Sequence, residues 1–447
     1  AAAKQSTSTS ECACPVTEAA AAAARAHATT RPALLLTRTS HALLRPTRPD
    51  AAMLGAPRHD GDADAAVRAQ QQGAAPSSAS PRDLVLASAG LLHRGDVDGA
   101  RRAADEALSA ADPRGDAADR LAYHFARALA RRVGAAAAAS SAPGPGPPSA
   151  TAYLAYNQIA PFLRFAHLTA NQAILDAAAG GGPRRLHIVD LDAAHGVQWP
   201  PLLQAIADRA DPGVGPPEVR ITGAGPDRDV LLRTGDRLRA FAGSLNLPFR
   251  FHPLLLPCTA QLAADPATGL ELHPGETLAV NCVLFLHRLG GEGEVTAFLK
   301  WVKSMNPTVV TLAETEASDD CCPEDGLQRR VTAAMDYYSA VFDALEATVP
   351  PGSADRLSVE HEILGQEIDV VVAPGHAGGR ARGFESWAAA ARAAGLTPRQ
   401  LSGFAVSQAR LLLRLHYPSE GYTAEEAGGA CFLRWQRRTL MSVSSWQ

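Results

Sequence analysis

The second half of the sequence alternates short apolar runs with amphipathic segments, and this alternation restricts the possible folds more than any other feature. A short run rich in β-branched residues predicts a strand, and apolar residues at helical spacing predict a helix. After the Gly-Gly-Gly-Pro break at 180–183, strands are predicted at 186–191, 218–222, 249–252, 277–285 and 308–313, and helices at 200–209, 227–242 and 294–302. Strands and helices in this order form a parallel, doubly wound sheet with helices on both faces.

The last part of the sequence adds more helices and two further strands. The helices are predicted at 327–347, 355–372, 384–394 and 404–415, and the strands at 429–435 and 440–446. An antiparallel terminal pair beside a parallel sheet is typical of S-adenosylmethionine-dependent methyltransferases. We therefore expect an α/β fold with a Rossmann-like, methyltransferase-type doubly wound sheet over residues 180–447.

The N-terminal part of the sequence predicts two other regions. Residues 1–80 show no sustained apolar period and cannot bury enough apolar surface to offset chain entropy, so a disordered, low-complexity region is predicted. Residues 81–179 have apolar residues at helical spacing, interrupted by a Pro- and Gly-rich loop at 134–149, and predict an α-helical cap. Residues 19–49 contain five arginines and no acid, a composition typical of an organelle transit peptide; the alternatives are a disordered leader or a gene-model artefact.

Charge and cysteine content exclude several classes of protein. A formal net charge of -4 argues against a chain held to DNA or anionic lipid by overall positive charge, although a local arginine groove stays open. The seven cysteines are odd in number and scattered, so they do not form the framework of a small secreted domain, and a reducing compartment is indicated. Apolar runs of the length that spans a bilayer do not occur, and no membrane segment is expected.

The first predicted strand is followed by a polar loop and a helix that a proline opens. Asp190, Asp192 and His195 lie at the carboxyl end of this strand, where open α/β sheets bind ligands. A cofactor loop needs several glycines for close backbone approach, and this loop has only Gly196. Further metal ligands are not obvious in the loop. We therefore favour carboxylates that cap the turn and the next helix over a metal or cofactor cluster.

The second predicted strand weakens the enzyme interpretation further. It ends in Gly223-Ala224-Gly225 without the acidic residue that would bind ribose hydroxyls, although Asp227 lies shortly beyond. Gly-x-Gly without a third glycine is more often a tight turn than a nucleotide site. The sequence predicts no catalytic, cofactor-binding or metal-binding residues.

Together, these segments resemble the plant GRAS family of transcriptional regulators. The VHIID element of the family is matched by Leu186, His187, Ile188, Val189 and Asp190, with Asp192, Gly196, Gln198, Trp199 and Pro200 in the loop and helix that follow. The first and second leucine-rich regions are matched at 82–133 and 229–255, and the PFYRE region around 338–368. The SAW region is matched by Trp387, Gly395, Trp435, Ser444, Ser445 and Trp446. The resemblance covers residues 81–447 and is greatest to the lateral suppressor and monoculm branch.

Two positions depart from the family pattern. The chain closes on Ser444-Ser445-Trp446 instead of Ser-Ala-Trp, and Arg434 stands where a glycine usually precedes the tryptophan. An arginine at this position would disturb the turn if the backbone there needed a positive φ.

The resemblance implies a nuclear regulator of axillary meristem initiation, shoot branching and tillering. Its implied partners are other transcriptional regulators, GRAS proteins included, in a homodimer or heterodimer, together with promoter DNA. The candidate partner-binding residues are Leu84, Leu91, Leu92 and Leu121, and the alternative is that they pack the cap. The candidate DNA contacts are Arg233, Arg237, Arg239, Arg410 and Arg414. Two other classes stay open: an S-adenosylmethionine-binding, methyltransferase-like enzyme, which the fold order favours and the loop chemistry opposes, and a purely structural helical adaptor.

Overall fold

The computed structural model describes residues 79–138, 148–179, 184–193, 195–256, 270–289, 291–316, 326–373 and 382–447. The disordered region predicted over residues 1–80 lies outside the described residues up to residue 78, and so does the transit-like segment 19–49. Within the described ranges, no helix combines the length and the apolarity that a bilayer crossing requires.

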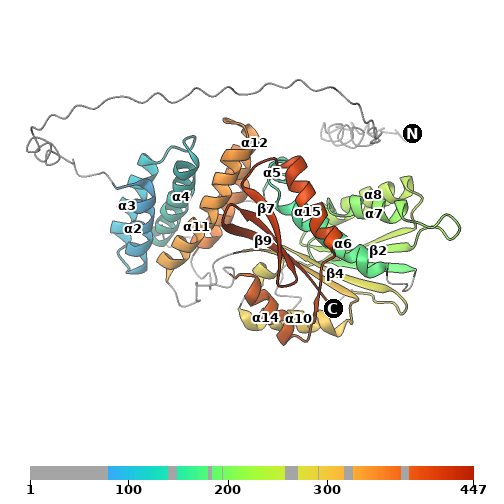
Figure 1. Ribbon diagram of the computed structural model, residues 1–447. Helices are drawn as coiled ribbons and strands as arrows, with labels where there is room; N and C mark the ends of the chain where they lie inside the picture. The colour runs from blue at the N-terminus through green and yellow to red at the C-terminus, as the bar shows by residue number, and fades with distance from the viewer. Residues whose placement is uncertain are drawn as a thin grey trace, which may run out of the picture. The chain divides into compact units, whose positions relative to one another are not determined.

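One mixed sheet of nine strands organises the chain (Figure 1). The parallel part contains β1 (Arg185–Asp190), β2 (Glu218–Gly225), β3 (Phe249–Leu255), β4 (Thr277–Val283) and β5 (Val309–Thr315). The antiparallel part contains β7 (Tyr422–Ala427), β8 (Ala430–Trp435) and β9 (Arg438–Trp446), and the order is β3-β2-β1-β4-β5-β9-β8-β7. The short strand β6 (Pro398–Arg399) pairs with β9. The predicted parallel sheet with an antiparallel terminal pair is confirmed.

Strands β6 and β7 were not among the predicted elements. Strand β7 is the edge of the sheet and buries little beyond Tyr422 and Ala424, so its sequence lacks an apolar run. Glu425 and Glu426 are exposed on it. Charged residues on an edge strand discourage pairing with another chain.

Helices cover both faces of the sheet (Figure 1). One face carries α6 (Phe162–Ala178), α7 (Trp199–Asp208), α8 (Arg228–Ser244) and α15 (Gly403–His416), and the other carries α10 (Glu292–Ser304) and α14 (Phe384–Ala393). Strand residues alternate between the two faces: Leu186 and Ile188 pack with α6, α7 and α8, whereas Val189 packs with α10 and α14. The doubly wound prediction is therefore confirmed.

The helical cap contains more of the chain than the sequence indicated. It includes α2 (Pro81–His93), α3 (Val97–Ala110), α4 (Ala117–Ala138) and α5 (Ala150–Ile159), as predicted for the N-terminal part. Helix α11 (Leu327–Thr348) and the continuous run of α12 (Ala354–Val359), the π-helix η3 (Glu360–Leu364) and α13 (Gly365–Val372) also pack on these helices. The predicted boundary at residue 179 therefore does not separate the cap from the rest of the chain, because helices from both sides of this boundary form the cap. The helical period shows that a helix has a buried face, but it does not show which element packs on that face.

The helical spacing predicted between the loop at 134–149 and residue 179 belongs to two helices. Pro161 separates α5 from α6, and Ala160 before it is extended at φ -117° and ψ 136°. The residue before a proline is pushed out of the helical region by the proline ring, which explains the break.

Candidate functional site

The carboxyl end of β1 is a fully paired polar cluster. Asp190 is only 4% exposed. Trp199 Nε1 donates to its Oδ2 at 2.9 Å, and Asn281 Nδ2 donates to its Oδ1 at 3.1 Å. Burial raises the pKa of Asp190 to about 7, and the nearby charge of Asp192 adds to the rise while the two hydrogen bonds oppose it. Both carboxyl oxygens of Asp190 are therefore hydrogen-bonded to side chains of the protein itself.

Gln198 extends this cluster from the sheet to helix α6. Its Nε2 donates to Asn171 Oδ1 on α6 and to Asn281 Oδ1 on β4, both at 3.1 Å. Thr311 Oγ1 on β5 donates to the same Asn281 oxygen at 2.9 Å. All of these side chains are buried. Such a satisfied network rigidifies the switch point between β1 and β4, where a doubly wound sheet would otherwise bind a ligand.

The histidine of the strand motif points to the opposite face and has a separate role. His187 is fully buried, with Nε2 2.9 Å from Thr222 Oγ1 and Nδ1 3.0 Å from Arg220 Nη2. Because arginine only donates, Nδ1 accepts and Nε2–H donates to the threonine. Burial and the Arg220 charge lower the pKa of His187 to about 4, so the ring is neutral. Arg220 is in turn paired with Glu276 at 2.5 Å.

The other residues of the loop after β1 do not converge on one point. Asp192 forms an ion pair with Arg288 at 2.5 Å, and the His195 ring lies 5.4 Å from the Tyr153 ring between centroids. Asp190, Asp192 and His195 therefore have three different sets of partners. No group of three acidic, histidine or cysteine side chains in the described part of the chain is arranged to hold a metal ion.

The tight turn expected at Gly223-Ala224-Gly225 is wrong: these residues are the end of strand β2 and pair with β3, and the glycines there serve packing. A methyl group added at Gly223 would lie 2.6 Å from the Phe251 ring and 2.8 Å from the Ala193 methyl carbon. A methyl group added at Gly235 on α8 would lie 2.6 Å from the same ring. The space beside the ends of β1 and β2 is thus occupied by Ala193 and Phe251, which explains the glycine without a nucleotide.

Comparison with known proteins agrees with this architecture. Residues 81–447 match the model of the GRAS domain family. The chain belongs to the GRAS domain family. It is 63% identical over 393 residues to Protein MONOCULM 1 of Oryza sativa subsp. japonica, an alignment that covers 82% of this chain and 88% of that protein. It is 47% identical over 303 residues to Scarecrow-like protein 18 of Arabidopsis thaliana, with 66% and 67% covered. The crystal structure of SCL7 in Oryza sativa is similar at a TM-score of 0.66 and 33% identity, and covers 83% of this chain and 100% of that one.

These matches establish the class of function. The chain is a transcriptional regulator in tillering and shoot branching, in the monoculm and lateral suppressor group of GRAS proteins. The methyltransferase alternative is not favoured.

The GRAS tryptophans at the C-terminus hold the sheet to its neighbours. Trp387 on α14 is buried under Arg382, whose guanidinium carbon lies 5.3 Å from the ring centroid. Trp435 on β8 donates from Nε1 to Asp343 Oδ2 on α11 at 2.7 Å. Trp446 on β9 is 1% exposed and donates to Ser444 Oγ at 2.9 Å. These residues lock the antiparallel strands between the cap and the parallel sheet.

The remaining SAW residues shape the chain around β9. Gly395 has φ 87° and ends α14, as an αL residue after a helix does. Ser445 Oγ donates to the Arg399 carbonyl at 2.6 Å and helps to hold β6 against β9. Arg434 does not need the positive φ that would have made an arginine disturb the turn: Gln436, with φ 50°, has the positive φ, and Arg434 forms an ion pair with Glu425 at 2.5 Å.

The partner-binding role predicted for two of the four leucines is wrong. Leu84 and Leu121 are buried in the cluster that joins α2 and α4 to α11, so they stabilise the cap and are not a contact surface. Leu91 and Leu92 at the end of α2 are partly exposed, and Leu92 packs against the same cluster.

The candidate arginines occupy two exposed helices. Arg233, Arg237 and Arg239 lie on α8, and Arg239 forms an ion pair with Asp236 at 2.5 Å. Arg410 and Arg414 lie on α15, where Arg410 Nε donates to the Ala424 carbonyl at 3.1 Å.

Asn171, Asn281 and Thr311 are members of the buried polar cluster that were not predicted. Their signal is a polar residue inside a buried apolar element, which requires an internal partner.

Proposed function

We propose that this GRAS protein acts in the nucleus as a transcriptional scaffold whose α/β core binds macromolecules and catalyses no reaction. The observation that carries the proposal is the internal pairing at the end of β1, where Trp199 and Asn281 occupy the carboxyl oxygens of Asp190. Ala193 and Phe251 fill the space beside Gly223. A methyltransferase-type sheet would need these groups and this space for its cofactor.

The arginines of α8 give the core a means to contact promoter DNA. Arg233 and Arg237 are both exposed and lie one turn apart. The pKa of Arg237 is lowered by partial burial and by repulsion from the positive charge of Arg233. A phosphate group between them would relieve this repulsion. Arg237 Nη2 also donates to the His195 carbonyl at 2.9 Å, which fixes the patch beside the loop after β1.

Contacts with other regulators, including a second GRAS protein in a homodimer or heterodimer, complete the proposed function. Of the four leucines named for this role, Leu91 and Leu92 retain exposed surface. Helix α15 adds exposed apolar residues, Phe404, Leu411 and Leu415.

Binding to a random-sequence DNA duplex at several salt concentrations tests the DNA contact. We expect affinity to fall steeply with salt, and the double variant Arg233→Ala/Arg237→Ala to reduce the slope of log affinity against log salt by about 2, because each lost phosphate contact contributes about 0.9. The matched control is Arg101→Ala/Arg102→Ala, which removes the same charge from two exposed arginines on α3. An unchanged slope in the α8 variant, or equal losses in both, would show that this patch does not meet DNA.

A further inference from the structure

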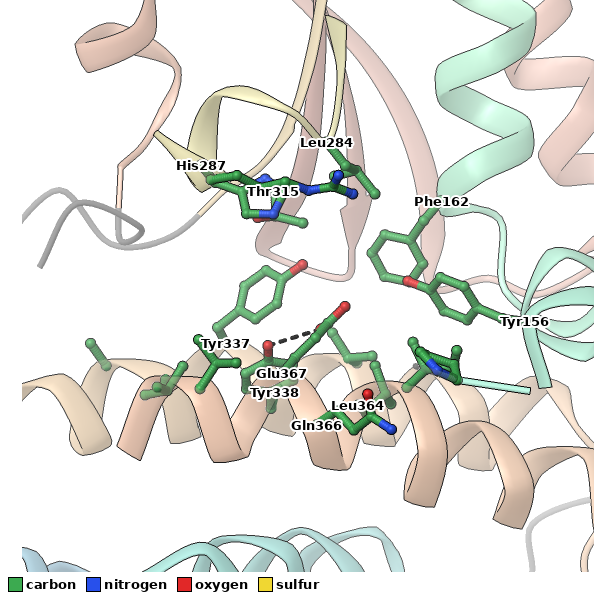
Figure 2. Close-up of a pocket in the computed structure, with 18 of the residues that line it drawn as sticks. Tyr156, Phe162, Leu284, His287, Thr315, Tyr337, Tyr338, Leu364, Gln366 and Glu367 are labelled. Atoms are coloured by element: carbon green, nitrogen blue, oxygen red, sulfur yellow. Dashed lines mark hydrogen bonds between the residues drawn. The ribbon is translucent and has the colours of Figure 1, made fainter. Parts of the chain in front are cut away.

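A cavity of about 380 Å³ lies between the helical cap and the carboxyl edge of the sheet (Figure 2). Its floor is formed by α11 and by the run of η3 and α13. The segment after β4, which includes the 3₁₀ helix η2 (Leu286–Arg288), and Thr315 at the end of β5 lie opposite. Tyr156 of α5 and Phe162 of α6 close one side. The volume is within the range of about 300–1,000 Å³ that is usual for small-molecule sites.

Most of the cavity wall is apolar. Ala334 and Val341 of α11 face Ile363, Leu364 and Val370 of the neighbouring run. The cavity is partly open to solvent, so the apolar side chains that line it are in contact with water. Burying this surface under an apolar molecule is favourable, and a recess of this size between cap and core points to such an occupant.

The polar groups of the cavity stand at opposite sides. His287 and Thr315 lie above the space in Figure 2, and Tyr338, Gln366 and Glu367 lie below it. Tyr338 O–H donates its proton to Glu367 Oε2 at 2.9 Å, so toward a ligand the tyrosine oxygen acts as a hydrogen-bond acceptor. A few convergent polar groups in an apolar pocket orient a ligand and give specificity.

The charges around the cavity are balanced. His287 Nδ1 lies 2.8 Å from Glu314 Oε2, and Arg288 is paired with Asp192 at 2.5 Å. Glu367 contributes a carboxylate and Arg330 a guanidinium. An anionic ligand would lose its hydration here and would lie near the Glu367 carboxylate, while Arg288 already has a carboxylate partner in Asp192. The chemistry therefore favours a neutral molecule.

Two unusual backbone features border the same cavity. Leu284, whose side chain lines it, has φ 51°. A left-handed conformation is strained at a residue that carries a side chain. The π-helix at Glu360–Leu364 supplies Ile363 and Leu364 to the wall. Strained residues and π-helical turns are both concentrated at functional sites.

We propose that this cavity is a binding site for a neutral, largely apolar small molecule with hydroxyl or carbonyl groups, held between the cap and the core. Such a ligand would contact α11 and α13 on one side and the ends of β4 and β5 on the other. Its binding would therefore stabilise the packing of the cap on the core. The regulator would respond to a small molecule at a place separate from its paired β1 end.

A fluorescence titration of the full chain with N-phenyl-1-naphthylamine, a neutral apolar probe, tests the proposal. We expect saturable binding at one site. The variant Ala334→Trp places an indole in the cavity, and we expect it to weaken binding by at least about tenfold. The matched control is Ala347→Trp, an exposed position on the same helix α11, which should bind the probe like the native chain.

Circular dichroism and the unfolding midpoint show whether each variant is folded, and Ala334→Phe replaces the tryptophan variant if that variant does not fold. The anionic probe 1-anilinonaphthalene-8-sulfonate should bind more weakly than the neutral one. Absence of saturable binding, or full binding by a folded cavity-filling variant, would overturn the site. Tighter binding of the anionic probe would overturn the assignment of a neutral ligand.

Discussion

Replacement of Trp199 by alanine is expected to lower the free energy of unfolding by about 3–5 kcal/mol, as is typical for a fully buried aromatic side chain. Trp199 is 0% exposed at the start of α7, and its indole is packed among Leu186, Ile188 and Leu202. The alanine variant would also leave Asp190 Oδ2 without its donor at 2.9 Å. An unpaired buried acceptor adds its own desolvation cost. Unfolding in guanidinium, followed by circular dichroism, measures the difference.

Two further variants separate the causes of this loss. Trp199→Phe keeps most of the volume and removes the N–H donor, and we expect it to cost about 1–3 kcal/mol. Trp301→Ala on α10 makes the same truncation at a partly exposed tryptophan, and its effect should be clearly smaller. If Trp199→Ala were no more harmful than Trp301→Ala, the cluster at the end of β1 would not be holding the core together.

Replacement of Arg120 by methionine is expected to cost about 3–5 kcal/mol, because it removes the hydrogen-bond donor of a buried carboxylate, Glu360, and leaves it only the longer ion pair with Arg356 at 3.8 Å. Arg120 on α4 is 0% exposed, and its Nε donates to Glu360 Oε2 at 2.9 Å. Its Nη1 lies 2.7 Å from Glu346 Oε2 on α11. The arginine therefore ties the N-terminal helices of the cap to helices that come from the middle of the sequence. Guanidinium unfolding again provides the measurement.

The double variant Arg120→Met/Glu360→Leu tests the reason for that loss. It removes one charge of each sign and leaves Arg356 paired with Glu346 at 3.1 Å, so most of the stability should return. The control is Arg82→Met, which breaks an exposed ion pair with Asp336 and should change stability by no more than about 1 kcal/mol. If the double variant were as unstable as Arg120→Met, the loss of stability would come from the packing of the arginine side chain and not from the Glu360 carboxylate that has lost its donor.

Strand and helix order could be read from the sequence because each element carries its own period. Leu186, Ile188 and Val189 make a buried run, and α8 has its apolar residues at helical spacing. Pro161 carried a signal for the break between α5 and α6, because proline restricts the residue before it. The edge strand β7 carried no such signal, since most of its residues are exposed.

What the sequence could not show is which elements meet. Helix α11 reads as one more helix after the parallel strands, yet it packs on α2 and α4. Leu84 and Leu121 resembled a surface ridge only because their partners on α11 and α13 are far away in the sequence. The cavity is hidden for the same reason: its walls come from segments around residues 156, 284, 334 and 364. The buried polar cluster had a readable signal in Asn171 and Asn281, each a polar residue inside a buried element.

We propose that the methyltransferase-like sheet of this GRAS protein is a scaffold whose cofactor position is filled by its own side chains. A calorimetric titration of S-adenosylmethionine into the full chain tests this proposal. We expect no heat of binding up to millimolar ligand, because Asp190 is bonded to Trp199 and Asn281 and because Ala193 and Phe251 fill the space beside Gly223. Saturable binding at micromolar concentration would contradict the scaffold proposal and would make Asp190 and Gly223 the first residues to replace.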